Sequence, residues 1–79
     1  MSKLSAPSQQ ELFIIRALRR RVLEELKARK LGKADLARLL DMYPSGAGGL
    51  LLETHWSLET AVRVADALGI DVAESVKAG

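Results

Sequence analysis

The sequence predicts a single all-α domain, and three observations lead to this prediction. Apolar residues recur at three- and four-residue spacing through most of the chain, and no segment shows the alternating pattern of a half-buried strand. Residues that start and stop helices divide the chain into five segments. The length of 79 residues leaves room for one core.

The composition is typical of a soluble globular protein. Hydrophobic residues make up 48% of the chain and charged residues 28%, which excludes a disordered polymer. The sequence contains no cysteine, so disulfides, thiolate zinc sites and cysteine nucleophiles are excluded. Residues 1–7 lack the apolar stretch of a signal peptide, and no apolar run approaches the ~20 residues of a membrane span. We therefore expect a cytoplasmic protein with no membrane contact.

The first helix is expected to be long. Residues 1–7 are expected to be a flexible N-terminus, and residues 8–79 to form the domain. Ser8 and Glu11 have the spacing of a capping box, good helix formers continue to Lys30, and Gly32 is expected to stop the helix. The apolar stripe of this helix is expected to be buried and comprises Leu12, Ile15, Leu18, Val22 and Leu26.

A second, short helix is predicted over residues 33–40, followed by a turn at residues 41–43. The inward-facing residues of this helix are expected to be Ala34, Leu36, Ala37 and Leu40. Pro44 suits the first position of a third helix. Two alternatives stay open for residues 44–52, because three glycines penalise a helix there by roughly 3 kcal/mol relative to alanine. The segment is either a helix held by tertiary packing or a loop.

Two further helices are predicted near the C-terminus. Ser57 is a good cap for a helix that ends at Gly69, and Glu59 in its first turn favours the helix dipole. Its apolar face is expected to comprise Leu58, Ala61, Val64, Ala65 and Leu68. Asp71 is expected to cap a last short helix, with Glu74 at the third position.

Charge is distributed unevenly along the chain. Residues 1–33 hold nine basic and three acidic side chains, whereas residues 34–79 hold three basic and seven acidic ones. Such asymmetry indicates either a polyanionic or acidic protein partner for the first part, or a helix with a solvated basic face.

Two blocks of the sequence resemble one known family. Residues 23–40 read LEELKARKLGKADLARLL, and residues 57–70 read SLETAVRVADALGI. Both blocks resemble the Cro/CI-type (Xre family) helix-turn-helix domain, and the similarity covers about residues 12–76. The long first helix is closest to the small antitoxin-like branch, related to the HigA antitoxins. The resemblance implies a five-helix, lambda-repressor-like domain with an extended N-terminal helix.

The resemblance also implies a DNA-binding surface. The segment from Tyr43 to Leu52 would be the recognition helix, whose first turns read base edges in the family. Pro44 and Gly49 carry no side-chain donor or acceptor, so only Tyr43 and Ser45 can contact a base. The residues expected to contact phosphates are Lys27, Lys30, Lys33, Arg38 and His55.

Other residues indicate a protein interface, or exclude further kinds of site. The run of leucines at 50–52 is wider than one buried face needs, and the residues expected at an interface are Leu51, Leu52 and Trp56. The alternative is that these residues belong to the core. With a single histidine we expect no metal site and no cofactor. We expect no catalytic residues and no enzyme activity, because no acid–base pair or substrate pocket is apparent.

The sequence therefore predicts a transcriptional regulator that binds double-stranded operator DNA as a homodimer, since so small a core favours association. The alternative is a helix-turn-helix scaffold used for protein–protein binding, such as an antitoxin that binds a toxin or an assembly adaptor, with weak or no sequence-specific DNA binding.

Overall fold

The computed structural model describes residues 8–78, with side chains to residue 75, and it confirms the all-α class. The expected flexible N-terminus at residues 1–7 lies outside the described residues. Within them, the helices are α1 (Gln9–Arg29), α2 (Lys33–Leu40), α3 (Pro44–Leu52), α4 (Leu58–Ala67) and α5 (Val72–Ala78).

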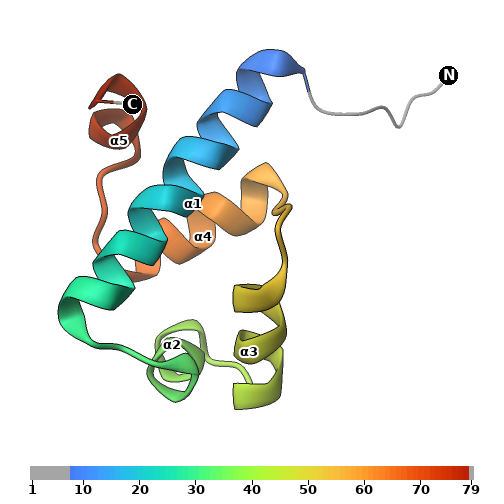
Figure 1. The fold of residues 1–79 in the computed structure, drawn as a ribbon, viewed down its shortest axis with the longest axis vertical. Coiled ribbons are helices and arrows are strands. Elements are labelled where there is room, and N and C mark those ends of the chain that lie inside the picture. The colour runs from blue at the N-terminus through green and yellow to red at the C-terminus, as the bar shows by residue number, and fades with distance from the viewer. Residues whose placement is uncertain (1–7, 79) are drawn as a thin grey trace, which may run out of the picture.

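The helices form two connected groups. α1 packs on α4 and α5, whereas α2 packs on α3 and also touches α4. Figure 1 shows α2 and α3 together at one end of the molecule, below the crossing of α1 and α4. One core joins the groups, because the fully buried residues include Leu18 and Val22 of α1, Leu36 of α2, Ala47 of α3 and Val64 of α4.

The start of α1 matches the prediction. The hydroxyl of Ser8 accepts a hydrogen bond from the backbone N–H of Glu11 at 3.1 Å, and the carboxylate of Glu11 accepts one from the N–H of Ser8 at 3.1 Å. The buried stripe is also confirmed for Ile15, Leu18, Val22 and Leu26. Leu12 is only partly buried.

The end of α1 differs from the prediction. Lys30, not Gly32, takes the left-handed conformation that ends the helix, with φ of 57°. Its N–H still donates to the carbonyls of Leu26 and Lys27, which offsets part of the roughly 1–2 kcal/mol cost of that conformation. Gly32 is extended and serves as the N-cap of α2, where its N–H donates to the carboxylate of Asp35 at 2.9 Å.

α2 buries three of its four expected residues. Leu36, Ala37 and Leu40 are buried, whereas Ala34 is exposed. At 100° per residue, Ala34 lies about 160° from Leu36 around the helix axis, so the two cannot share one buried face. The prediction for Ala34 was wrong for this reason.

The caps of the last two helices and the apolar face of α4 match the prediction closely. The hydroxyl of Ser57 accepts a hydrogen bond from the N–H of Thr60, and the carboxylate of Asp71 accepts one from the N–H of Glu74. Gly69 follows the end of α4 with φ of 73°. The residues of α4 and its cap that are buried are Ala61, Val64, Ala65 and Leu68, and Leu58 is partly buried against them.

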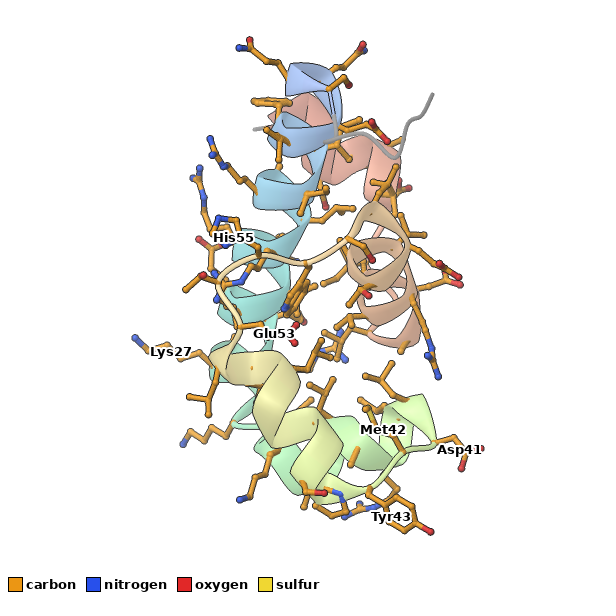
Figure 2. The ribbon with its side chains drawn as sticks, turned by 90° about the vertical axis from the view of Figure 1, so that its right-hand side faces the viewer. Lys27, Asp41, Met42, Tyr43, Glu53 and His55 are labelled. Carbon is orange, nitrogen blue, oxygen red and sulfur yellow. The ribbon has the colours of Figure 1, made fainter. Side chains whose placement is uncertain are left out.

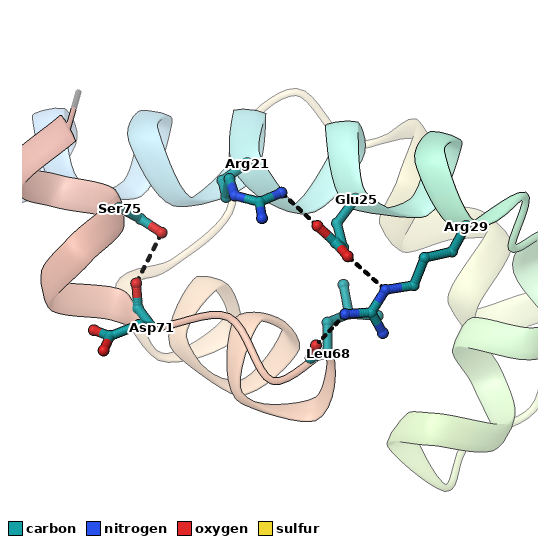
Figure 3. A network of polar contacts seen from close by, with 6 residues as sticks. All are labelled: Arg21, Glu25, Arg29, Leu68, Asp71 and Ser75. Carbon is teal, nitrogen blue, oxygen red and sulfur yellow. Dashed lines mark hydrogen bonds and ion pairs between the residues drawn. The ribbon is translucent and has the colours of Figure 1, made fainter.

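A short polar network ties α1 to the end of α4. Glu25 lies between Arg21 and Arg29, with nitrogen–oxygen distances of 2.6 Å and 2.5 Å (Figure 3). Arg29 also donates from Nη2 to the carbonyl of Leu68 at 2.9 Å. Hydrogen bonds from Arg29 first, and from Arg21 second, hold the pKa of the Glu25 carboxyl below its ordinary value.

Truncation of Leu18 tests the central position of the α1 stripe. Leu18→Ala removes a side chain with no exposed surface, and we expect the free energy of unfolding to fall by about 2–5 kcal/mol. Urea denaturation followed by circular dichroism measures the change. Phe13→Ala is the matched control on the same helix, because Phe13 is 48% exposed and should cost far less. Equal losses in the two variants would contradict the described core.

The network around Glu25 predicts a pH dependence of stability. Because the pKa of Glu25 is lowered on folding, its contribution is present above the ordinary value of 4.5 and is lost as the pH falls through the lower, folded value. Glu25→Gln should therefore lower the urea midpoint at pH 7. As the pH is lowered, the urea midpoint of this variant should fall less steeply than that of the parent protein. Glu24→Gln is the control at an exposed neighbouring residue, and the urea midpoint of this variant should fall with pH as steeply as that of the parent protein.

Candidate nucleic-acid interface

α2 and α3 are joined by the tight turn that the sequence predicts. Asp41 ends α2 with a left-handed conformation, φ of 56°, and its N–H donates to the carbonyls of Ala37 and Arg38. Tyr43 is then extended and forms the N-cap of α3, and Pro44 occupies the first helical position, where its missing N–H costs nothing. The chain therefore changes direction within three residues, and α3 packs against α2.

The structure holds residues 44–52 as a helix, which decides between the two alternatives. Tertiary packing stabilises this helix where the helix propensity of its residues is low, because Ala47 is packed with no exposed surface. Two of the glycines face close neighbours: a Cβ at Gly46 would lie 2.8 Å from Cε of Met42, and one at Gly48 would lie 3.3 Å from Cδ of Lys33. The glycines thus leave room against α3 for the side chains of Met42 and Lys33.

The outward face of α3 offers few polar side chains. Ser45 is exposed, and Tyr43 at the start of the helix is 83% exposed and points away from the body of the molecule (Figure 2). Gly46 and Gly49 are exposed as well and present backbone only. Besides the carboxylate of Asp41 in the turn, one hydroxyl and one phenol are the side-chain groups of this turn and face that can hydrogen-bond a base edge.

Three of the five residues predicted to contact phosphates belong to α2 or closely precede it, namely Lys30, Lys33 and Arg38. Lys27 lies on α1 near Thr54, which follows the end of α3. Lys27, Lys30, Lys33 and Arg38 are all exposed. The stem of Lys33 lies alongside Gly48, so its charge is held beside α3. Arg38 is paired only loosely with Asp35, at 3.7 Å, and this exposed pair leaves its charge available to a ligand.

His55 is not brought to the same place. It follows the end of α3, whereas Tyr43 and Ser45 lie at the start of that helix, and Figure 2 shows His55 and Tyr43 far apart along the molecule. Its Nδ1 lies 3.0 Å from the hydroxyl of Thr54. His55 lies instead on the same side of the molecule as Lys27 (Figure 2).

The three residues considered for a protein interface differ in exposure. Trp56 is buried, with 5% of its surface exposed, and its indole N–H donates to the carbonyl of Leu50 at 3.0 Å, so for this residue the core alternative holds. The indole belongs to the core cluster, with Arg19 of α1 over its ring and the backbone of α3 at its N–H. Leu51 is partly buried against the core, whereas Leu52 is 83% exposed.

Sequence analysis missed two arginines that hold this region in place. Arg63 of α4 donates to the carbonyl of Leu40 at the end of α2, at 3.1 Å. Arg19 of α1 donates to the carbonyl of Glu53 at the end of α3, at 2.8 Å, and its guanidinium carbon lies 5.6 Å from the centroid of the Trp56 ring. The sequence gives no signal for either contact, because both partners are backbone atoms distant in the chain.

Comparisons of this chain with protein-family models, curated proteins and solved structures found no match. Across residues 8–78, no helix has the combination of length and hydropathy that a membrane crossing requires. Within the same residues, no group of three histidine, aspartate or glutamate side chains comes together as a metal site.

Glycine substitutions test the description of α3. A Cβ at Gly49 would meet no atom within 4 Å, so we expect Gly49→Ala to raise the free energy of unfolding by about 1 kcal/mol through helix propensity. Gly69→Ala is the matched control: it also meets no atom, but at φ of 73° it should destabilise by about 1–2 kcal/mol. Thermal melts measure both. A destabilising Gly49→Ala would indicate that the segment is not helical.

Proposed function

We propose that this protein is a DNA-binding transcriptional regulator, and that α2, its turn and α3 act as a helix-turn-helix of the Cro/CI type within a lambda-repressor-like domain. The observation that carries the proposal is the exposed start of α3, with Tyr43 and Ser45, beside exposed cations of α1 and α2. A short helix that projects with cations around it fits the major groove of DNA.

Phosphate contacts supply most of the affinity in this proposal. Lys27, Lys30, Lys33 and Arg38 would contact the DNA backbone, and each contact contributes about −0.9 to the slope of log K against log salt. Four contacts give a slope of about −3.6 per protomer. The bare glycine surface of α3 lets the helix backbone come close to the groove, while Ser45 and Tyr43 supply limited base readout.

A homodimer is part of the proposal. A two-fold dimer would place two copies of α3 on half-sites about one helical turn, or 34–36 Å, apart. Doubling the number of phosphate contacts would compensate for the few base contacts that each copy can make. Such a regulator would act in the cytoplasm by occluding a promoter, without catalysis and without a cofactor.

The second candidate function is a protein-binding module built on the same helices, such as an antitoxin or an assembly adaptor. The observation that favours it is the exposed leucine at the end of α3, because Leu52 has 83% of its surface exposed. The lack of base-reading side chains at Pro44 and Gly49 favours it too. A protein partner, such as a toxin, would bury Leu52.

A salt titration of DNA binding tests the first function. Fluorescence anisotropy would compare the protein's own upstream DNA with a random duplex of equal length, and we expect at least a hundredfold preference for the former at physiological salt. Lys33→Glu and Ser45→Glu should each weaken binding about tenfold or more. Arg20→Glu is the matched control, because it reverses a cation of α1 that lies near the segment after α3 and not near the start of that helix.

If the affinity for the upstream DNA is about equal to that for the random duplex, operator recognition is rejected. If Leu52→Ser then abolishes function in the cell while the fold is retained, the second function replaces the first. Loss of binding in Arg20→Glu equal to that in Lys33→Glu would contradict the assigned surface.

A further inference from the structure

A second basic surface lies on the outer face of α1. It is a groove of about 340 Å³ between α1 and the chain segment that follows α3. Four cations line it, Arg16, Arg19, Arg20 and Lys27, together with Leu23 and a single acid, Glu24. We call it the α1 groove. Lys27 and His55 lie on this side of the molecule in Figure 2.

The spacing of its residues on α1 makes the groove a continuous stripe. Arg16, Arg20, Leu23 and Lys27 follow one another at intervals of four, three and four residues, which places them on one helix face. At a rise of 1.5 Å per residue, the stripe extends about 16 Å along the helix. Leu23, partly buried, lies between the cations and gives the groove an apolar floor.

The cations of the stripe have no acidic partner within the protein as described. No carboxylate of residues 8–75 lies within 4.0 Å of the charged nitrogens of Arg16, Arg20 or Lys27. On another face of the same helix, Arg21 and Arg29 share Glu25. Positive charge is thus neutralised on that other face but not in the groove, and the groove therefore favours the binding of an anion.

One wall of the groove is fixed in place. Arg19 is held by its hydrogen bond to the carbonyl of Glu53 and by its position over the Trp56 ring. Among the described residues, its Nε is the only buried side-chain nitrogen or oxygen without a hydrogen-bond partner. A fixed guanidinium loses little conformational entropy when a ligand binds, which favours recognition at this wall.

Apart from Lys27, which belongs to both surfaces, the groove lies away from the proposed DNA surface. α1 packs on α4 and α5 and not on α3, and Arg16 lies in its first half and Arg20 near its middle. The groove borders the segment after the C-terminal end of α3, whereas Tyr43 and Ser45 lie at the opposite end. A duplex seated on the start of α3 is therefore directed away from Arg16 and Arg20. The apolar floor also fits a protein segment better than a phosphate backbone.

We propose that the α1 groove binds an acidic segment of another protein, in which carboxylates flank an apolar side chain that rests on Leu23. A helix with acids four residues apart presents them about 6 Å apart, which matches the separation of Arg16 and Arg20 along α1. Guanidinium groups bind carboxylates in pairs of parallel hydrogen bonds, so these arginines supply specificity as well as charge. Only Lys27 is common to the groove and to the proposed phosphate contacts, so Arg16 and Arg20 make this binding separable from the proposed DNA binding.

A labelled peptide tests this proposal on the full chain. The probe is a fluorescein-labelled helical peptide with glutamates opposite Arg16, Arg20 and Lys27 and a leucine opposite Leu23, and anisotropy measures its dissociation constant at physiological salt. We expect a dissociation constant below about 100 μM, which is within the range of short peptide ligands. Replacing the leucine of the probe by serine should weaken binding several-fold.

Two neighbouring arginines provide the matched variants. Arg20→Gln should weaken peptide binding about tenfold and leave DNA binding within twofold, because Arg20 belongs to the groove. Arg21→Gln removes the same charge one residue further on, outside the groove, and should leave peptide binding unchanged. Circular dichroism would confirm that both variants fold, and Arg16→Gln repeats the test at a second position of the stripe.

Three results would overturn the proposal. The first is no peptide binding below 1 mM, and the second is equal weakening by Arg20→Gln and Arg21→Gln. The third is loss of random-duplex binding in Arg16→Gln and Arg20→Gln with peptide binding retained, which would make the stripe a nucleic-acid contact. Failure of operator binding in the α2–α3 variants bears on the proposed function alone.

Discussion

Burial of the apolar stripe of α1 is the interaction on which the rest of the structure depends. α2 and α3 span only eight and nine residues, and helices this short are marginal in water without packing. α3 carries three glycines in addition, so its own propensity opposes the fold. Leu18 and Val22 have no exposed surface and help to form the one core that also includes Leu36 and Ala47. The long helix thereby organises the two short ones.

The sequence predicted most element boundaries because local chemistry determines them. Ser8, Ser57 and Asp71 each accept a hydrogen bond from an N–H three residues later, and this pattern needs no tertiary information. The stripe of α1 was predictable for a similar reason, since helical periodicity depends on spacing alone. The fold class and the turn at Asp41 also follow from such local signals.

The misplaced residues depend on contacts that are distant in the chain. Gly32 was expected to end α1, but Lys30 does so, and Gly32 forms part of the cap of α2 with Asp35. For Trp56 the sequence left an interface and the core as alternatives, and the residue packs in the core and donates its indole N–H to the carbonyl of Leu50. The candidate DNA surface was predictable in its cations but not in its geometry, because His55 lies at the far end of α3 from Tyr43.

Three arginines described above each donate to a carbonyl at the C-terminal end of a different helix: Arg63 to Leu40, Arg19 to Glu53 and Arg29 to Leu68. Each places a positive charge at the negative pole of a helix dipole. Their acceptors are neutral amide oxygens, so mobile ions compete with these contacts less directly than with an ion pair between two charged side chains. The contacts between the helices are consequently less sensitive to ionic strength than the binding of a polyanion. A rise in salt can release a bound polyanion while the helices keep their mutual orientation. Some of the basic residues near the N-terminus therefore hold the helices together, and the others are available to bind an anionic partner.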